Sequence, residues 1–243
     1  MPLRFYDTLS RALREFEPVE PGRVGLYACG PTVYQLPHIG NYRTFLFNDV
    51  LHRWLEWKGF DVTFVMNLTD VDDRIIDKAA AAGLSVPAYT EPFINGFMEE
   101  LETLGVRAAD AYPRATESID AMTHLVERLL ARGHAYATDD GVFFDISSFD
   151  RYGRHSRIPL DEVRAGDRVA DDRYEKGDAR DFALWKAPKP ADGEVGAVWD
   201  GPVVDGARMA GRPGWHLECS AMSMSRLGET FDIHAGGEDL VFP

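Results

Sequence analysis

One stretch of this sequence combines side chains that could do chemistry with glycines that open the backbone to a ligand. Residues 27–41, YACGPTVYQLPHIGN, contain Cys29 and then His38, Gly40 and Asn41. A glycine at a helix start lets a phosphate approach unpaired N–H groups, and an imidazole or amide beside it can donate a hydrogen bond as charge develops. A plain Pro-Gly turn with an incidental histidine explains the same residues, because short motifs recur by chance.

The second cysteine of the chain gives Cys29 a candidate partner. Cys219 lies in WHLECS, beside His216 and Glu218, and His234 follows. Thiolates together with imidazole or carboxylate suit a tetrahedral Zn²⁺. No compact C-x-x-C spacing is present, and a lone thiol is usually a small buried hydrophobe. Both interpretations of the cysteines therefore stay open at this point.

Acidic residues and a glycine pair form two further candidate sites. The stretch NLTDVDD places Asp70, Asp72 and Asp73 near an expected helix start. They could bind Mg²⁺ or a substrate ammonium, but stabilisation of the helix N-terminus is the favoured interpretation for Asp72 and Asp73. In HAGGEDL, the glycines at 236–237 offer a close approach, and Asp239 suits a ribose hydroxyl or an adenine edge.

The elements that must position these residues follow from hydrophobic periodicity. Residues 23–29 and 61–68 predict strands, and 41–58 and the stretch up to about residue 82 predict helices. Alternation of strand and helix at short intervals is typical of a parallel α/β sheet, and the right-handed crossover rule then brings the carboxyl ends of both strands to one edge. Further helices are predicted over 89–104, 116–132 and 215–227.

The middle of the chain departs from this alternation. HAYATDDGVFFDI predicts a hairpin with Asp140–Gly141 as its turn, and 186–214 is predicted to be loop-rich. We therefore expect an insertion with some β structure between two halves of an α/β domain. Trp215 and His216, directly after it, are most simply core and helix-start residues.

Composition excludes several classes of protein. A formal net charge of −14 argues against a module that grips phosphates along its whole length, although a local basic patch remains compatible with it. No apolar window is long enough for a transmembrane helix, and the N-terminus lacks a secretory signal. Two cysteines 190 positions apart are more typical of thiols or ligands than of a disulfide framework. We expect a cytoplasmic protein.

Four stretches, in this order, resemble the cysteinyl-tRNA synthetases, a family of class I aminoacyl-tRNA synthetases. They are YACGPTVYQLPHIGNYRTFLFNDVLHRWLEWKGFDVTFVMNLTDVDDRII, DFALWK, GRPGWHLECSAMS and FDIHAGGEDLVFP. The resemblance covers almost the whole chain. It implies an α/β fold with a Rossmann-like parallel sheet: residues 1–115 would form its first half, 116–210 the connective insertion, and 211–243 the start of its second half.

The resemblance also implies roles for individual residues. PHIGN would be the class I signature, with His38 and Asn41 catalytic and Gly40 at the phosphates of ATP, which enters with Mg²⁺. The remaining implied residues are Gly236, Gly237 and Asp239 near the nucleoside; Gly30, Thr69, Trp215 and His234 around cysteine; and Cys29 and Cys219 as ligands of a Zn²⁺ that binds the substrate thiolate.

The implied reaction is cysteine activation by ATP followed by transfer to tRNA(Cys), by a protein expected to be a monomer. The family often has histidine where Asn41 stands, and it usually has glycine where Ala235 stands. It also continues past LVFP into a His-His-Glu-Asn-Glu run and carries a Lys-Met-Ser-Lys-Ser loop, so we expect an N-terminal fragment with little or no activity alone. Two alternatives remain: a ligase that joins activated cysteine to an amino sugar in mycothiol-type thiol biosynthesis, and a non-catalytic binding protein derived from the same fold.

Overall fold

A three-stranded parallel sheet lies at the centre of the computed structural model, which describes residues 2–155 and 181–237. Its strand order is β10–β3–β4, with β3 spanning Arg23–Ala28, β4 Asp61–Met66 and β10 Ile233–Ala235. Both pairings are parallel, so a strand from near the end of the chain lies beside the first strand of the sheet. The predicted parallel α/β sheet is confirmed.

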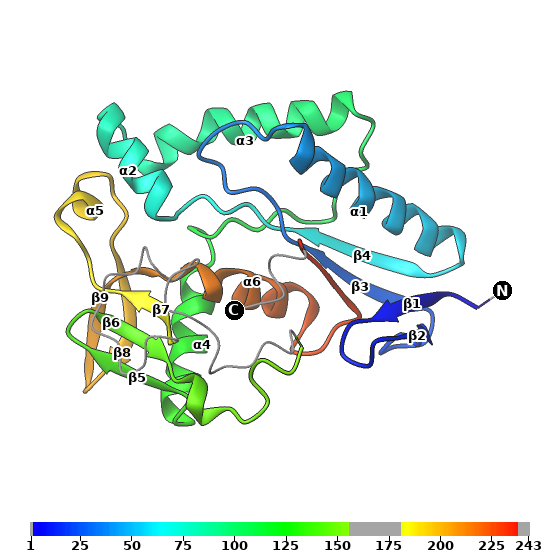
Figure 1. Ribbon diagram of the computed structural model, residues 1–243. Coiled ribbons are helices and arrows are strands. Elements are labelled where there is room, and N and C mark those ends of the chain that lie inside the picture. The colour runs from blue at the N-terminus through cyan, green and yellow to red at the C-terminus, as the bar shows by residue number, and fades with distance from the viewer. Residues whose placement is uncertain (1, 156–180, 238–243) are drawn as a thin grey trace.

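Helices cover both faces of this sheet, with α1 and α3 on one side and α4 and α6 on the other (Figure 1). Their bounds are Ile39–Trp57 for α1, Asp73–Ala82 for α2, Val86–Thr103 for α3, Ile119–Ala131 for α4 and Trp215–Leu227 for α6. Each predicted helix is present. Several start where a polar side chain accepts a hydrogen bond from the first turn, as His38, Asp72 and Ser85 do.

A second, antiparallel sheet with strand order β5–β6–β7–β9–β8 lies beside the first (Figure 1). Its strands are β5 Ala135–Thr138, β6 Gly141–Phe144, β7 Phe182–Lys186, β8 Trp199–Val204 and β9 Ala207–Pro213. Two short helices lie between these strands in the sequence: the 3-10 helix η1, Ile146–Ser148, and α5, Pro190–Glu194. The prediction that 186–214 is loop-rich is therefore wrong. The domain limits remain predictions, and β9 runs across the expected limit at residue 210.

The glycines that made this segment look like a loop have packing and turn roles instead. A Cβ on Gly201 would come within 2.3 Å of the Trp185 ring, and a Cβ on Gly211 within 2.7 Å. The two glycines therefore let β8 and β9 lie close to that buried indole. Asp205 and Gly206 both have positive φ, at 49° and 84°, which a tight two-residue hairpin turn requires. Close packing and one turn thus account for these residues.

The predicted hairpin at 135–144 is present, but its turn is displaced by one residue. Thr138 pairs with Gly141, so Asp139 and Asp140 form the turn and Gly141 belongs to the strand. A Cβ on Gly141 would lie 2.1 Å from the Trp185 carbonyl oxygen, which explains a glycine at this position of β6.

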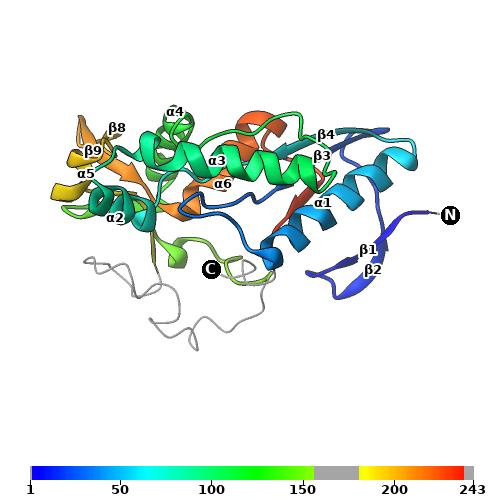
Figure 2. The same ribbon diagram turned by 90° about the horizontal axis from the view of Figure 1, so that it is seen from above.

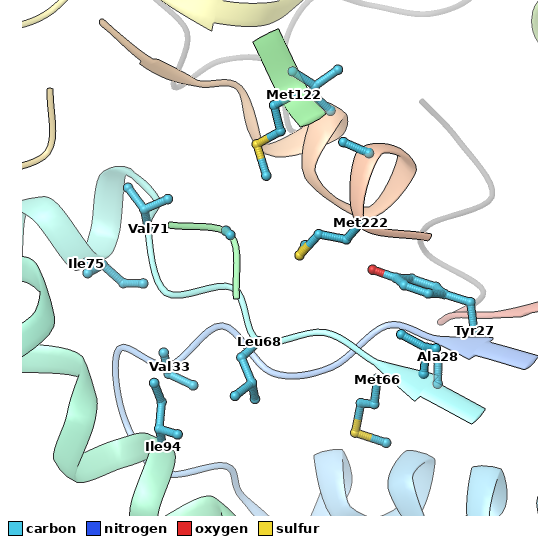
Figure 3. Close-up of a cluster of buried hydrophobic side chains, with 14 of the residues drawn as sticks. Tyr27, Ala28, Val33, Met66, Leu68, Val71, Ile75, Ile94, Met122 and Met222 are labelled. Carbon is cyan, nitrogen blue, oxygen red and sulfur yellow. The ribbon is translucent and has the colours of Figure 1, made fainter. Parts of the chain in front are cut away.

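The hydrophobic core is continuous through the parallel sheet and reaches both helix layers (Figure 3). The carboxyl-terminal half of β3 is completely buried, as is typical of a parallel strand covered on both faces. Tyr27 extends toward Met222 of α6, while Met66 lies on the side of α1. This core fixes the sheet edge at which the predicted site residues lie.

A short hairpin precedes the central sheet and stands to one side of it in Figure 2. It consists of β1, Arg4–Asp7, and β2, Ala12–Glu15. Edge-to-face contacts run from Phe5 to Phe16 and on to Phe60, and they attach this hairpin next to the end of α1. In the described ranges, no helix is both long and apolar enough to cross a membrane.

Candidate active site

A cavity of about 360 Å³ opens where β3 and β4 end. Seven of the predicted site residues line it: Cys29, Gly30, Asn41, Thr69, Trp215, Cys219 and Gly237. They come from the loop after β3, the start of α1, the end of β4, α6 and the segment after β10. His38, Gly40, Gly236 and His234 are outside this lining, and Asp239 is outside the described residues.

Gly30 lets the loop after β3 lie directly against the end of β4. A Cβ at this position would be 1.7 Å from the Asn67 carbonyl oxygen. The Gly30 N–H donates to the Asn67 side chain at 3.0 Å, and the Asn67 amide donates to the Thr69 hydroxyl at 3.1 Å. Thr69 is 3% exposed, and its backbone bonds to Pro31 and Val33. These contacts fix the floor of the cavity.

The two cysteines meet on this floor. Their sulfurs are 3.2 Å apart, although 190 positions separate them in the sequence. Cys29 directly follows β3. Because side chains alternate along a strand, Cys29 is on the same face as Tyr27. Cys219 lies in the middle of α6. The hydrogen bond with Cys29, together with burial, raises the pKa of the Cys219 thiol well above its ordinary value.

The cysteine pair fits part of a zinc site. Two thiolates at adjacent corners of a zinc tetrahedron lie about 3.8 Å apart when each Zn–S bond is about 2.3 Å, so a small separation of these sulfurs would admit the ion. Among the described residues, no three His, Cys, Asp or Glu side chains are arranged to hold a metal. This part of the chain therefore offers two of the four ligands.

Burial shifts the pKa values of Glu218 and His234, two ionisable neighbours of Cys219, in opposite directions. Burial raises the pKa of Glu218 well above its ordinary value, and nearby Cys219 adds to this effect. Burial lowers the pKa of His234, which lies next to Tyr27 across the β10–β3 pair with ring centroids 5.0 Å apart. Both shifts favour the uncharged form of the group, so burial here opposes a charge beside the thiols.

The start of α1 arranges His38, Gly40 and Asn41 as a reciprocal cap. Nδ1 of His38 accepts from the Gly40 N–H at 2.9 Å, and the Asn41 side chain accepts from the His38 N–H at 3.1 Å. Because Nδ1 is the acceptor, the ring proton of neutral His38 is at Nε2. A Cβ on Gly40 would come within 2.7 Å of the imidazole, so a side chain there would displace the His38 ring from this cap.

The acids of NLTDVDD have structural partners. Asp72 caps α2 by accepting from the Ile75 N–H at 2.7 Å, which confirms the favoured interpretation of this residue. The carboxylate of Asp73 is bonded to Lys186 at 2.9 Å and Arg212 at 2.5 Å, both from the antiparallel sheet. Burial alone would raise the pKa of Asp73, but these two cations outweigh it and hold the pKa below its ordinary value.

Sequence reasoning missed several residues of the cavity lining, among them an aromatic residue and a cation that lie together. Tyr34 and Arg74 both line it, and the Arg74 guanidinium lies 4.6 Å from the centre of the Tyr34 ring. No sequence signal links them, because the contact joins the loop after β3 to α2. Trp215 is the first residue of α6 as expected, but at 38% exposed it is a cavity wall rather than a core residue.

The parallel sheet interrupted by an antiparallel insertion, with a cavity where the strands end, is the architecture of a class I aminoacyl-tRNA synthetase catalytic domain. A solved structure of Mycobacterium tuberculosis methionyl-tRNA synthetase in complex with methionyl-adenylate matches this fold with a TM-score of 0.60. The match covers 85% of this chain and 47% of that one at 15% sequence identity.

The sequence comparisons specify the family. The model of the class I (C) tRNA synthetase catalytic domain matches residues 15–243, and the chain belongs to this family. Cysteine–tRNA ligases of Geobacillus thermodenitrificans and Pyrococcus horikoshii are 47% and 46% identical over 99% and 100% of the chain. The chain spans about half the length of these curated relatives, 50% and 49% respectively.

Proposed function

We propose that this chain is the cysteine-activating part of a cysteine–tRNA ligase. In the proposed reaction, the cysteine carboxylate attacks the α-phosphate of ATP, pyrophosphate leaves, and the cysteinyl group passes to the terminal adenosine of tRNA(Cys). The observation that carries the proposal is the pair of thiols, 3.2 Å apart, on the floor of a cavity at the carboxyl edge of the sheet. Membership of the family and the names of the relatives support tRNA, rather than an amino sugar, as acceptor.

The thiol pair would select the substrate. Cys29 and Cys219 would hold two positions on a Zn²⁺ ion, which when bound supplies a soft Lewis acid for the substrate sulfur. Asn67 and Thr69 hold the floor beneath the thiols, and Trp215 walls the cavity on the side of α6. A site built around one strong polar contact discriminates sharply against an analogue that lacks it.

The start of α1 would serve the phosphates of ATP, which would enter with Mg²⁺. The cap described above leaves the Nε2–H of His38 as the free ring donor, suited to an oxygen on which charge develops. Asn41 lines the cavity, where its amide can contribute in the same way. Gly237, also on the lining, would leave space for the nucleoside beside Gly236. Positioning and charge stabilisation, rather than covalent catalysis, would then drive the reaction.

We also propose a cytoplasmic location, where a reducing environment would keep Cys29 and Cys219 available as thiolate ligands.

Isothermal titration with a non-hydrolysable cysteinyl-adenylate analogue, in the presence of zinc, tests this function. The chain should bind the analogue, and Cys29→Ala should weaken binding at least tenfold. Ser220→Ala is the matched control, because Ser220 is an exposed α6 residue next to Cys219. Absence of binding, or equal affinity in all three proteins, would contradict the proposal.

A further inference from the structure

The cysteine pair on the floor of the cavity has a second chemistry besides metal binding. Cys29 and Cys219 are the two cysteines of the sequence, and their sulfurs lie 3.2 Å apart. A disulfide bond is about 2.05 Å long, whereas two thiolates on one zinc ion lie about 3.8 Å apart. The observed separation lies between these two values, about 1.2 Å from a disulfide and about 0.6 Å from the zinc geometry.

The elements that carry the two sulfurs hold them near each other. The Cys29 N–H donates to the Ala235 carbonyl at 2.9 Å, which attaches this end of β3 to β10. On the other side, the sulfur of Cys219 lies 3.8 Å from Oδ1 of Asn67, which also accepts from the Gly30 N–H at 3.0 Å. One amide group therefore contacts both α6 and the loop that follows Cys29, and rotation of the two cysteine side chains covers the remaining distance to a disulfide.

Small oxidants can reach this pair from solvent. Both cysteines line the cavity of about 360 Å³, and neither residue is fully buried. Exchange between thiols and disulfides depends on such access. Because the sequence has two cysteines, a disulfide within one chain can join only Cys29 to Cys219. Its formation is therefore a change with a single product.

We propose that Cys29 and Cys219 form a reversible disulfide, which closes the cavity to its thiol ligand when small disulfides prevail over small thiols. One protein thiolate attacks a sulfur of the small disulfide and releases a thiol, and the other then attacks the mixed disulfide and releases the second thiol. Two electrons pass from the protein pair to the small disulfide, and the two protons of the protein thiols end on the released thiols. The reverse exchange reopens the site, and cysteine, the proposed substrate, is itself a thiol that can drive it.

The disulfide and a zinc ion exclude each other at this pair. A bridged sulfur is no longer a thiolate, and a separation of about 2.05 Å cannot match the roughly 3.8 Å between two ligands of one zinc ion. Closure of the site rests on the proposed function, because it matters only where the pair holds the metal that selects cysteine. Formation of the disulfide rests on the geometry of the two sulfurs alone.

Treatment of the intact chain with cystine, with and without zinc, tests this inference. Intact-mass measurement should show the loss of two hydrogens, and thiol titration should show both thiols consumed and then restored by dithiothreitol. Zinc at about ten times its Kd should slow the reaction about tenfold, because only the metal-free fraction can react. In zinc-supplied buffer, the bridged chain should bind the cysteinyl-adenylate analogue about tenfold more weakly or worse, and reduction should restore the affinity.

The double variant Cys219→Ser, Ser220→Cys is the matched control. It keeps two cysteines but moves one of them to the exposed neighbouring position of α6, and successive helix residues point about 100° apart. Cystine should then attach to the thiols as mixed disulfides, which raises the mass instead of lowering it. Cys29→Ser, which leaves Cys219 in place, should also give a mixed disulfide, and thermal melting should show that both variants fold.

The outcomes separate the inference from the proposed function. If the reduced chain binds the analogue but cystine leaves the thiols intact or gives only mixed disulfides, the inference is overturned and the proposed function stands. The inference also fails if the control bridges as fast as the wild type, or if the bridged chain binds the analogue as tightly as the reduced one. If the reduced chain binds no analogue, the proposed function fails and closure fails with it, while the mass and the thiol count still decide whether the disulfide forms.

Discussion

Replacing Arg212 by alanine should destabilise the chain by about 3–5 kcal/mol, because it breaks a buried charge network. The Arg212 side chain is 2% exposed; its Nε lies 3.0 Å from the Asp192 carboxylate, also 2% exposed, and its Nη2 lies 2.5 Å from Asp73. Burial would lower the pKa of Arg212, but the two carboxylates outweigh it and raise the pKa. Without the guanidinium, Asp192 keeps a backbone N–H at 2.8 Å but loses its buried counter-charge.

Urea unfolding followed by tryptophan fluorescence measures this change. For a chain of this size the expected loss corresponds to a fall in Tm of roughly 6–20 °C. Arg208→Ala is the control on the same strand: Arg208 is exposed and donates to the Gly201 carbonyl at 2.9 Å, so its loss should change stability by about 0.5 kcal/mol. If Arg212→Ala costs under 1 kcal/mol, or no more than the control, the network does not hold the insertion to α2.

Two further predictions follow from the same structure. Gly30→Ala should abolish binding of the cysteinyl-adenylate analogue and cost about 1–3 kcal/mol, because its Cβ would lie 1.7 Å from the Asn67 carbonyl oxygen. Gly193→Ala is the control, because its Cβ would meet no atom within 4 Å, and it should leave analogue binding and stability unchanged. If Gly30→Ala and Gly193→Ala have equal effects in titration and in urea unfolding, the close approach at Gly30 is refuted. The folded-state pKa of Asp73 is depressed, so its stabilisation is present above its unfolded pKa of about 3.9 and is lost as pH falls below that value. The stability difference between wild type and Asp73→Asn should therefore shrink as pH falls from 6 toward about 2 in urea unfolding, and a pH-independent difference would contradict this sign.

The parallel sheet and its helices could be predicted from the sequence because their signals are local. Strand 61–68 and helix 41–58 have clear periodicity, and the crossover rule then places Cys29 and Thr69 at one edge. What sequence reasoning misjudged was the role of glycine. Gly201 and Gly211 permit close packing on Trp185, and that contact exists only once the sheet has formed.

In the candidate site, too, residues with a local sequence signal could be predicted, whereas contacts between remote segments could not. The cavity brings together Cys29, Cys219, Asn41 and Trp215 from separate segments, all of them singled out from the sequence. The partners of Asp73 could not be found in this way, since they lie 113 and 139 positions away on the insertion. Residue type revealed the thiols, whereas ion pairs between remote elements required the fold.

Discrimination between a thiol and a hydroxyl tests the central claim most directly. Titration of the zinc-supplied chain with cysteinyl-adenylate and seryl-adenylate analogues compares two ligands that differ at one atom. If Cys29 and Cys219 form part of a thiol-selecting site, the cysteinyl analogue should bind at least a hundredfold more tightly. Equal affinities for the two analogues would contradict this account of the site.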